Sequence, residues 1–322
     1  MFNRYKTRNL YIVFGILLAL VLLTALPGND KKMRSFKSEL SQFDPSAVSQ
    51  FHIYPKAGGE RISFRKSGER WTVSDASGAF NADGAQLDRM LQSISGLRAL
   101  RLAAREKEDW KKYEVSDSLG IRVEVLDGEK EVADLVLGRF SYAQPSGPVN
   151  PYQQQQGTMT TYVRLNKEKE VYAVDGFLAM SFNGQLKSFR DPRVLQLATS
   201  DMQRISISGM GPDFSLVHQD SLWLLNGVEA DSASMANYLS GLRSLRSTQF
   251  LPEDQYPAGS PTHQMKVEGP QGELVVQVDA HVADSMHMAI TSSLNPGTWF
   301  DGTQDELFEK LFKNQEHFRR IN

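Results

Sequence analysis

Apolar and polar residues follow the same order in two parts of this 322-residue chain. Apolar residues alternate with polar ones near residues 48–53 and again near residues 202–207, which predicts a β-strand in each place. Each strand is followed by two short apolar segments around a turn, RISFRKSGERWTV and FSLVHQDSLWLL, and this pattern indicates a β-hairpin. Both parts are therefore predicted to begin with a strand and a hairpin.

A helix with one apolar face is predicted after each hairpin. Asp83 and Asp231 stand where an N-cap residue is expected. The apolar positions that follow are spaced to fall on one helical face; they are Met90, Ile94, Leu97 and Leu100 in the first part and Met235, Leu239, Leu242 and Leu245 in the second. The C-terminal half of each helix would then carry a repeated phrase, SGLRALR at 95–101 and SGLRSLR at 240–246.

Four arginines of the repeated phrase are predicted to lie on or near the far side of these helices. They are Arg98, Arg101, Arg243 and Arg246. A cation at the C-terminal end of a helix complements the helix dipole, which gives these residues a structural role. The alternative is a basic stripe that contacts a partner.

The order of the remaining elements also repeats. Each part continues with a loop, two strands around a Gly turn, a further strand that ends in an Asp-Gly turn at 175–176 or 301–302, and a closing helix. In the second part, Thr303 and Glu306 have the spacing of a capping box.

We predict an α+β fold in which two tandem repeats follow an N-terminal transmembrane helix. Each repeat would be a mostly antiparallel sheet with helices packed on one face. The first repeat covers residues 38–195 and the second covers residues 196–322. SFRDPRVLQL, residues 188–197, connects them, and Pro192 is expected to end the last helix of the first repeat.

One long segment, SYAQPSGPVNPYQQQQGTMTTY at residues 141–162, has no counterpart in the second repeat. Its three prolines and four consecutive glutamines argue against a regular strand over most of its length. A long exposed loop is predicted, and such loops are usually either disordered or functional. In the functional alternative, Tyr142, Tyr152 and Tyr162 would anchor a protein partner.

The N-terminal part of the chain is predicted to anchor the protein in a membrane. LYIVFGILLALVLLTAL, residues 10–26, contains no charged residue and is just long enough to span a bilayer. Three basic residues precede it, which favours a cytoplasmic N-terminus, and four follow it, which weakens that orientation. Residues 1–37 would form a cytoplasmic tip, a single-pass inner-membrane anchor and a basic juxtamembrane segment, with the bulk of the chain periplasmic. A cleaved signal peptide is the alternative.

Charge and cysteine content narrow the function classes. Residues 1–37 carry seven Lys or Arg against one acid, a net of +6, and the remainder carries 29 against 37, a net of −8. The acidic part is therefore a poor ligand for nucleic acid, and no nucleic-acid partner is expected. The absence of cysteine excludes disulfides, thiolate metal sites and cysteine nucleophiles.

The motifs of common enzyme classes are absent from the sequence. It contains no H-E-x-x-H zinc motif, no EF-hand loop, no Gly-rich phosphate loop and no G-x-S-x-G elbow. His281 and His287, the nearest pair of histidines, would lie too far apart along one strand to share a metal. We therefore expect a non-enzymatic protein with no catalytic residues, no metal site and no cofactor.

The chain resembles the bacterial family called domain of unknown function 4340. The resemblance rests on the RNLYIVFGILLALVLL segment, GERWTV, the helix with GLRALR, the TTYVRL and VYAVDGFL pair and the FRDPRVL connector. Members of this family are typically membrane-anchored envelope proteins, often encoded beside the permease, ATPase and gliding-type components of an ABC-2-like exporter. The resemblance implies an accessory subunit and supplies no catalytic residues.

Two functions remain open from the sequence. The leading hypothesis is a membrane-anchored accessory or scaffold subunit of an ABC-type export or gliding-related envelope complex, with a permease or auxiliary subunits as protein partners. The alternative is a module that binds envelope glycan or lipid in a crevice between the repeats. Trp71, Trp223 and Trp299 would line that crevice, although a tryptophan after a turn more often belongs to a hairpin core.

Overall fold

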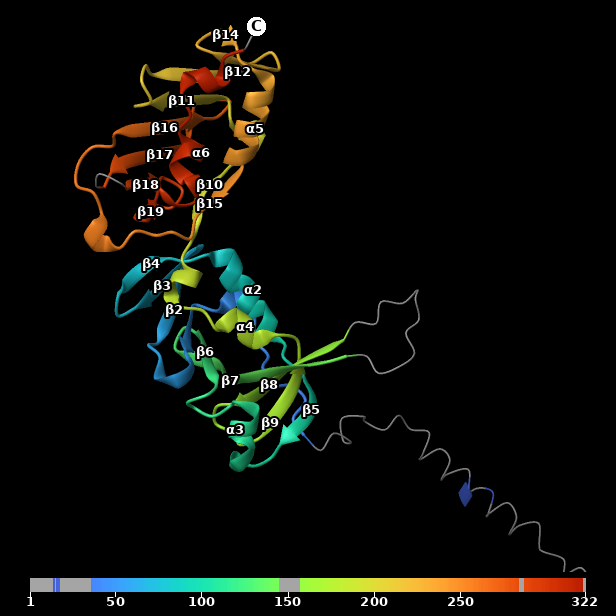
Figure 1. Ribbon diagram of the computed structural model, residues 1–322. Coiled ribbons are helices and arrows are strands. Elements are labelled where there is room, and N and C mark those ends of the chain that lie inside the picture. Colours follow the sequence, from blue (N-terminus) through green and yellow to red (C-terminus); the bar gives the residue numbers. More distant parts are fainter. Residues whose placement is uncertain (1–13, 15, 18–35, 145–156, 284–286, 321–322) are drawn as a thin grey trace, which may run out of the picture.

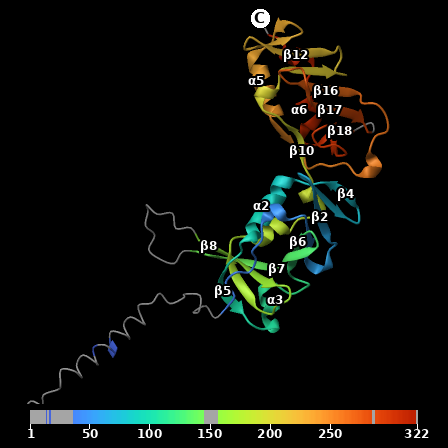
Figure 2. The same ribbon diagram turned by 180° about the vertical axis from the view of Figure 1, so that it is seen from behind.

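The computed structural model describes residues 14, 16–17, 36–144, 157–283 and 287–320. Most of these residues form two lobes, which we define as the N-terminal lobe (36–191) and the C-terminal lobe (192–320). The lobes are stacked end to end, and the view from behind shows the same arrangement (Figures 1 and 2). Each lobe has its own apolar core.

The N-terminal lobe contains a nine-stranded sheet within the described residues, with the order β4-β3-β2-β1-β6-β7-β8-β9-β5. Every neighbouring pair in it is antiparallel. The strands are β1 Gln50–Tyr54, β2 Ile62–Ser67, β3 Arg70–Asp75, β4 Gly78–Asn81, β5 Ala99–Ala104, β6 Ile121–Asp127, β7 Lys130–Ala143, β8 Thr158–Leu165 and β9 Val171–Asp175. The helices are α2 Gly84–Ser95, α3 Trp110–Tyr113 and α4 Leu178–Phe182.

The C-terminal lobe contains an eight-stranded antiparallel sheet with the order β14-β13-β12-β11-β16-β17-β18-β19. Its strands are β11 Arg204–Ser208, β12 Phe214–Gln219, β13 Leu222–Leu225, β14 Val228–Glu229, β16 His263–Glu268, β17 Leu274–Val282, β18 Met288–Ser292 and β19 Trp299–Asp301. A separate two-stranded sheet pairs β10 Arg193–Gln196 with β15 Ser244–Arg246. The helices are α5 Ser232–Leu242 and α6 Leu307–Leu311.

The two large sheets have the same strand order, because β11–β14 replace β1–β4 and β16–β19 replace β6–β9. One strand differs between them. β5 pairs with β9 at the edge of the first sheet, whereas β15 leaves the second sheet and pairs with β10, the strand through which the chain enters the C-terminal lobe. The α+β class and the antiparallel sheets predicted from the sequence are confirmed.

The predicted starts of the two long helices are also confirmed. The carboxylate of Asp83 accepts a hydrogen bond from the backbone N–H of Gln86, and the carboxylate of Asp231 accepts one from Ser234. Both residues therefore act as N-caps. The predicted capping box at the end of the chain is wrong, because the Thr303 hydroxyl accepts the backbone N–H of Met288 and makes no cap hydrogen bond.

The N-terminal sheet is covered on both faces where β7, β8 and β9 lie. Leu135 and Leu137 of β7 point into the main core, which includes α2 and α4, whereas Val136 packs with Tyr113 and Val115 on the opposite face. The prediction of helices on one face is therefore corrected for this lobe. The physical reason is that consecutive side chains in these strands point to opposite faces and both sets are buried, so both faces need cover.

The repeated phrase is not helical throughout, which corrects the sequence prediction. α2 and α5 end inside it, and the residues that follow become β5 and β15. Leu100, predicted to lie on the apolar helix face, is 56% exposed. The backbone N–H of Leu40 donates to the carbonyl of Leu97, and that of Leu197 donates to Arg243, so a preceding segment of each lobe pairs with the phrase. Such long-range pairing leaves no trace in a local helical period.

Long-range strand pairing also includes residues at two boundaries predicted from the sequence, those of the 141–162 loop and of the two repeats. β7 continues to Ala143 and β8 begins at Thr158, so strand pairing covers both ends of the segment predicted as a loop over 141–162. Residues 145–156 of that segment lie outside the described residues. The predicted boundary between residues 195 and 196 falls inside β10.

Among the described residues, no helix is both long enough and apolar enough to cross a bilayer. The predicted anchor at residues 10–26 lies almost entirely outside the described residues. It therefore stays a prediction.

Arg164 is the most deeply buried arginine among the described residues of the N-terminal lobe. Arg164 of β8 is 1% exposed, and its guanidinium carbon lies 3.9 Å from the ring centre of Trp110. Its Nε donates to the carbonyl of Val115 at 3.0 Å, and Nη1 donates to that of Asn166 at 2.7 Å. Burial lowers the pKa of Arg164, and the ion pair with Asp117 partly offsets this. A buried cation is tolerated because these groups satisfy it.

We predict that Arg164→Met lowers the free energy of unfolding by about 2–4 kcal/mol, because two buried carbonyls lose charged donors. Asp117→Asn is the matched control. The Asp117 side chain is 85% exposed, so loss of its ion pair with Arg164 should lower the free energy of unfolding by about 1 kcal/mol or less. Denaturant unfolding of the full chain in detergent, followed by tryptophan fluorescence, measures both. Equal losses in the two variants would show that the ion pair, and not the carbonyl bonds, carries the stability.

Candidate functional site

The segment that connects the lobes places a buried cation between them. Arg190 is 8% exposed, and its guanidinium carbon lies 3.9 Å from the ring centre of Phe80 and 4.0 Å from that of Phe250. Phe80 belongs to β4 of the N-terminal lobe, and Phe250 follows β15 in the C-terminal lobe. Burial lowers the pKa of Arg190, and the neighbouring Tyr256 hydroxyl partly offsets this. Stacking on two rings from different lobes therefore holds the lobes together.

An ion pair fixes the turn that follows Arg190. Asp191 is 3% exposed, and its carboxylate accepts hydrogen bonds from Nε and Nη2 of Arg193 at 2.6–3.0 Å. The backbone N–H of Arg193 donates to the same carboxylate at 3.0 Å. These bonds raise the pKa of Arg193. A nearly buried carboxylate requires such partners, and the pair sets the course of the chain around Pro192 as it enters β10.

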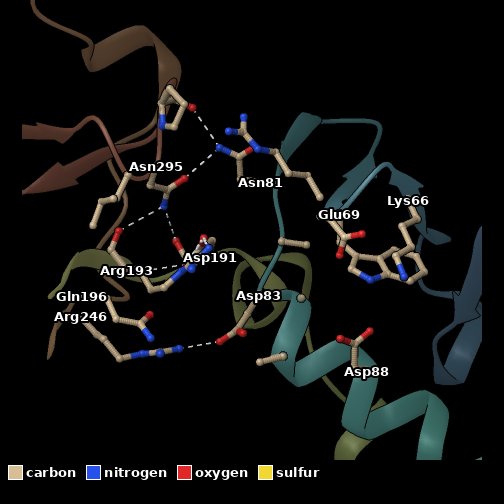
Figure 3. Close-up of a pocket in the computed structure, with 17 residues that line it drawn as sticks. Lys66, Glu69, Asn81, Asp83, Asp88, Asp191, Arg193, Gln196, Arg246 and Asn295 are labelled. Atoms are coloured by element: carbon tan, nitrogen blue, oxygen red, sulfur yellow. Dashed lines mark hydrogen bonds and ion pairs between the residues drawn. The ribbon is translucent and has the colours of Figure 1, made fainter. Parts of the chain in front are cut away.

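Two asparagine side chains bond the lobes directly (Figure 3). The amide nitrogen of Asn81, at the end of β4, donates to Oδ1 of Asn295 and to the carbonyl of Pro296, each at 2.9 Å. The amide nitrogen of Asn295, which is 1% exposed, donates to the carbonyl of Asp191 at 2.9 Å. The Thr298 hydroxyl donates to Oδ1 of Asn295 at 2.9 Å. Asn295 therefore joins β4, the connecting segment and the β18–β19 loop.

The carboxylate of Asp83 has two roles. One oxygen caps α2, and the other forms an ion pair with Arg246 of β15 at 2.5 Å. The Asp83 side chain is 12% exposed and that of Arg246 is 46% exposed, so the pair lies at the edge of the joint. We use the name interlobe joint for Arg190, Asp191, Arg193, Asn81, Asn295, Asp83 and Arg246.

A cleft of about 370 Å³ lies beside the interlobe joint. In Figure 3, Lys66, Glu69 and Asp88 lie on the wall that the N-terminal lobe forms. Gln196 and Arg246 of the C-terminal lobe lie across the cleft from them. Charged groups of both signs therefore line one cavity. Among the described residues that line it, none is Ser, Cys or His, so the lining offers polar recognition and no pair of nucleophile and imidazole base.

The three tryptophans predicted to line a crevice are not brought together. Trp71 forms part of the cleft wall but is 3% exposed and packs edge-on against Phe51, with 5.6 Å between ring centres. Trp223 lines a different groove in the C-terminal lobe. Trp299 packs against Tyr256 with its ring tilted by 31° and 5.5 Å between ring centres. The cleft therefore has a charged lining with one core tryptophan in its wall.

Three carboxylates converge in the N-terminal sheet, where Arg122 and Lys167 form ion pairs with them. Glu124, Glu131 and Asp134 each place an oxygen within 4.8 Å of the others. Nε and Nη2 of Arg122 donate to the two oxygens of Asp134 at 2.8 and 3.0 Å, and these bonds raise the pKa of Arg122. Asn166 donates a further bond to Asp134. The buried carboxylate is satisfied within the protein, so we do not assign a metal site to this cluster.

The tyrosines predicted as partner contacts have different surroundings. Tyr142 lies near the end of β7 and is 53% exposed. Tyr162 lies in β8, is 6% exposed and accepts a hydrogen bond from Arg101, so it belongs to the folded lobe and not to an exposed loop. Tyr152 lies outside the described residues.

The four predicted arginines are divided between the lobes and form no single stripe. Arg98 pairs with Glu39 on the surface at 3.5 Å, and Arg101 bonds to Tyr162. Arg243 lines the groove that contains Trp223, and Arg246 belongs to the interlobe joint. Only Arg246 has an assigned role between lobes, and the sequence offered no sign of its partner, since Asp83 lies 163 residues earlier.

The sequence predicts only a connector at FRDPR, whereas Arg190, Asp191 and Arg193 of this segment belong to the interlobe joint. A signal was present, because Arg, Asp and Arg around a proline are the residue types of a buried ion-paired turn. Phe80, Phe250 and Asn295 carried no such signal, since each is an ordinary residue of a strand end or loop.

Comparisons with known proteins place the chain in one family. No curated protein and no solved structure matched the chain. The family model described as "Domain of unknown function (DUF4340)" matches residues 71–264, which run from β3 across the interlobe joint into β16. Because this match covers more than half of the chain, the protein belongs to the DUF4340 family.

Proposed function

We propose that this protein is a membrane-anchored scaffold or accessory subunit of an envelope complex, and that it acts as a rigid spacer without enzymatic activity of its own. The observation that carries the proposal is the interlobe joint. A stacked guanidinium, two bonded amides and an ion pair connect the lobes, and these directional contacts favour one relative orientation. A fixed orientation is what a spacer between subunits requires.

The proposal includes an ABC-type export or gliding-related complex as the partner. Support comes from the family resemblance and from the apolar segment at residues 10–26, which would hold the described lobes at the periplasmic side of the inner membrane. The shared strand order of the two lobes supports an origin by duplication of one α+β unit. Two lobes in series double the reach of such a unit from the membrane.

A second candidate function rests on the cleft beside the joint. Its lining carries Lys66, Arg70, Glu69 and Asp88, so it could bind a polar ligand with several hydrogen-bonding groups, such as a fragment of envelope glycan. An apolar lipid chain fits this lining poorly because charged groups would lose their water.

The joint predicts a narrow range of interlobe distances. The chain has no cysteine, so spin labels at Gln92→Cys and Asn237→Cys report one distance between α2 and α5 without background. We expect Arg190→Met to broaden this distance distribution, because two cation–π contacts worth about 0.5–2 kcal/mol each are lost. Arg204→Met, which removes a surface ion pair with Glu268, is the control and should leave it narrow. An unchanged distance distribution in Arg190→Met would show that the stacking of Arg190 between Phe80 and Phe250 does not fix the relative orientation of the lobes.

The scaffold proposal predicts stable partners in the membrane. Tagged full-length protein, purified from native membranes in mild detergent, should recover a permease together with its ATPase. The same tag on an unrelated single-pass protein controls for nonspecific recovery. Recovery of the protein with no transporter subunit would contradict the proposed complex.

The second candidate predicts a measurable ligand. Isothermal titration with soluble peptidoglycan fragments should give binding that falls about tenfold in Arg70→Ala and Asp88→Ala, if each group donates or accepts one charged hydrogen bond. Arg65→Ala, an exposed change on the neighbouring strand β2, should bind as the native protein does. Absence of binding heat in the native protein would remove glycan from consideration.

A further inference from the structure

An open apolar groove of about 430 Å³ lies in the C-terminal lobe, between the β13–β14 hairpin and α5. Its apolar lining includes Leu222, Trp223, Met235 and Leu239. Leu222 is 48% exposed and Trp223 is half-buried, whereas Met235 and Leu239 are buried beneath them. An exposed leucine beside a half-buried tryptophan gives the groove an apolar surface that a partner protein can cover.

The same groove occurs in the N-terminal lobe, where it is the interlobe cleft. In each lobe the carbonyl of a tryptophan, Trp71 or Trp223, accepts the backbone N–H of an alanine just before the helix. Counting from the capping aspartates, Asp88 of α2 and Ala236 of α5 occupy the same position, and both line their groove. The two cavities are therefore equivalent places in two lobes of the same strand order.

The two equivalent grooves differ in which lobe lies against them. In the N-terminal lobe, residues of the C-terminal lobe form one wall of the groove, among them Arg246, Asn295 and Pro296. In the C-terminal lobe, every residue that lines the groove comes from that lobe, and Leu222 on its wall is 48% exposed. The established interlobe interface thus shows that this position accepts folded protein, and its second occurrence is open.

The charges at the groove's edge specify the chemistry of an occupant. Glu229 forms an ion pair with Arg320 at 2.9 Å, which balances its charge. Arg243 also lines the groove, and among the described residues no carboxylate lies within ion-pair distance of it. The unbalanced charge at this surface is therefore positive, and it lies beside apolar side chains. An apolar segment that carries a carboxylate complements both features.

We infer that the open groove of the C-terminal lobe binds an apolar segment of a partner protein, flanked by an Asp or Glu that pairs with Arg243. The inference rests on the proposed scaffold function and names the surface through which it acts. Apolar side chains of the partner contact Leu222 and Trp223, and its carboxylate reaches Arg243 at the C-terminal end of α5. The partner occupies the place that the C-terminal lobe itself occupies on the N-terminal lobe.

Site-specific photo-crosslinking of the full-length protein in its native membranes tests this inference. The probe is the photoreactive residue p-benzoylphenylalanine, introduced at Ala236 in the groove or at Asn237, which is exposed on the same helix but does not line the groove. We expect a protein adduct from position 236 and none from 237. Mass spectrometry of the adduct should map the crosslink to an apolar segment that contains Asp or Glu.

Variants then test the two contacts. Arg243→Glu should lower the adduct yield roughly tenfold, as loss of a close charge pair predicts, while Arg243→Lys retains most of it. Leu222→Ser should also lower the yield, and Leu274→Ser, which changes a similarly exposed leucine outside the groove, should not. Thermal unfolding confirms that each variant is folded, and Arg243→Gln replaces Arg243→Glu if the latter is not.

Several results would overturn the inference. They are no adduct at position 236, equal adducts at 236 and 237, an adduct with lipid or with a second copy of this chain, a mapped segment without a carboxylate, or a yield unaffected by Arg243→Glu. Transporter subunits recovered by affinity purification without a groove adduct would leave the scaffold function standing and remove this surface from it. A groove adduct with a protein outside any transporter would reject the proposed complex and retain the groove.

Discussion

The guanidinium of Arg190 lies between Phe80 and Phe250, one ring from each lobe, and the arrangement of the two sheets depends on that contact. A buried arginine without hydrogen-bonded carboxylates is costly unless other groups compensate its charge, and the two ring faces do so only while both lobes are in place. The neighbouring Asp191 and Asn295 supply directional bonds around it. The joint therefore combines stacking, which sets the distance between lobes, with amide and ion-pair bonds, which set their rotation.

The two lobes share a strand order, but the equivalent groove beside the tryptophan differs between them in its lining and in what lies against it. In the N-terminal lobe, the groove beside the tryptophan has a charged lining and lies against the C-terminal lobe. In the C-terminal lobe, the equivalent groove has an apolar lining and is open. Arg70 and Leu222 stand one residue before the two tryptophans, and Asp88 and Ala236 stand five residues after the two caps. A few substitutions on a shared framework are thus enough to separate an internal contact from an external surface.

Several buried polar groups of the described residues bind one another. Arg164 is satisfied by carbonyls and by Asp117, and Arg122 balances Asp134 in the carboxylate cluster. Tyr238 is fully buried, donates to the carbonyl of Leu311 at 2.6 Å, and has its pKa raised by burial. Such groups stabilise the two cores and leave surfaces and clefts as the places where function is sought.

The sequence by itself determined the elements whose signals are local. Alternation predicted β1 and β11, turn residues predicted the hairpins, and Asp83 and Asp231 predicted where α2 and α5 begin, because strand alternation, turns and N-caps depend on neighbouring residues. Tertiary structure alone decided the rest. The SGLR phrase turns from helix to strand because distant segments pair with it, and Asp83 meets Arg246 because two lobes pack together. Contacts between residues far apart in the chain depend on the packing of whole lobes, which no local pattern encodes.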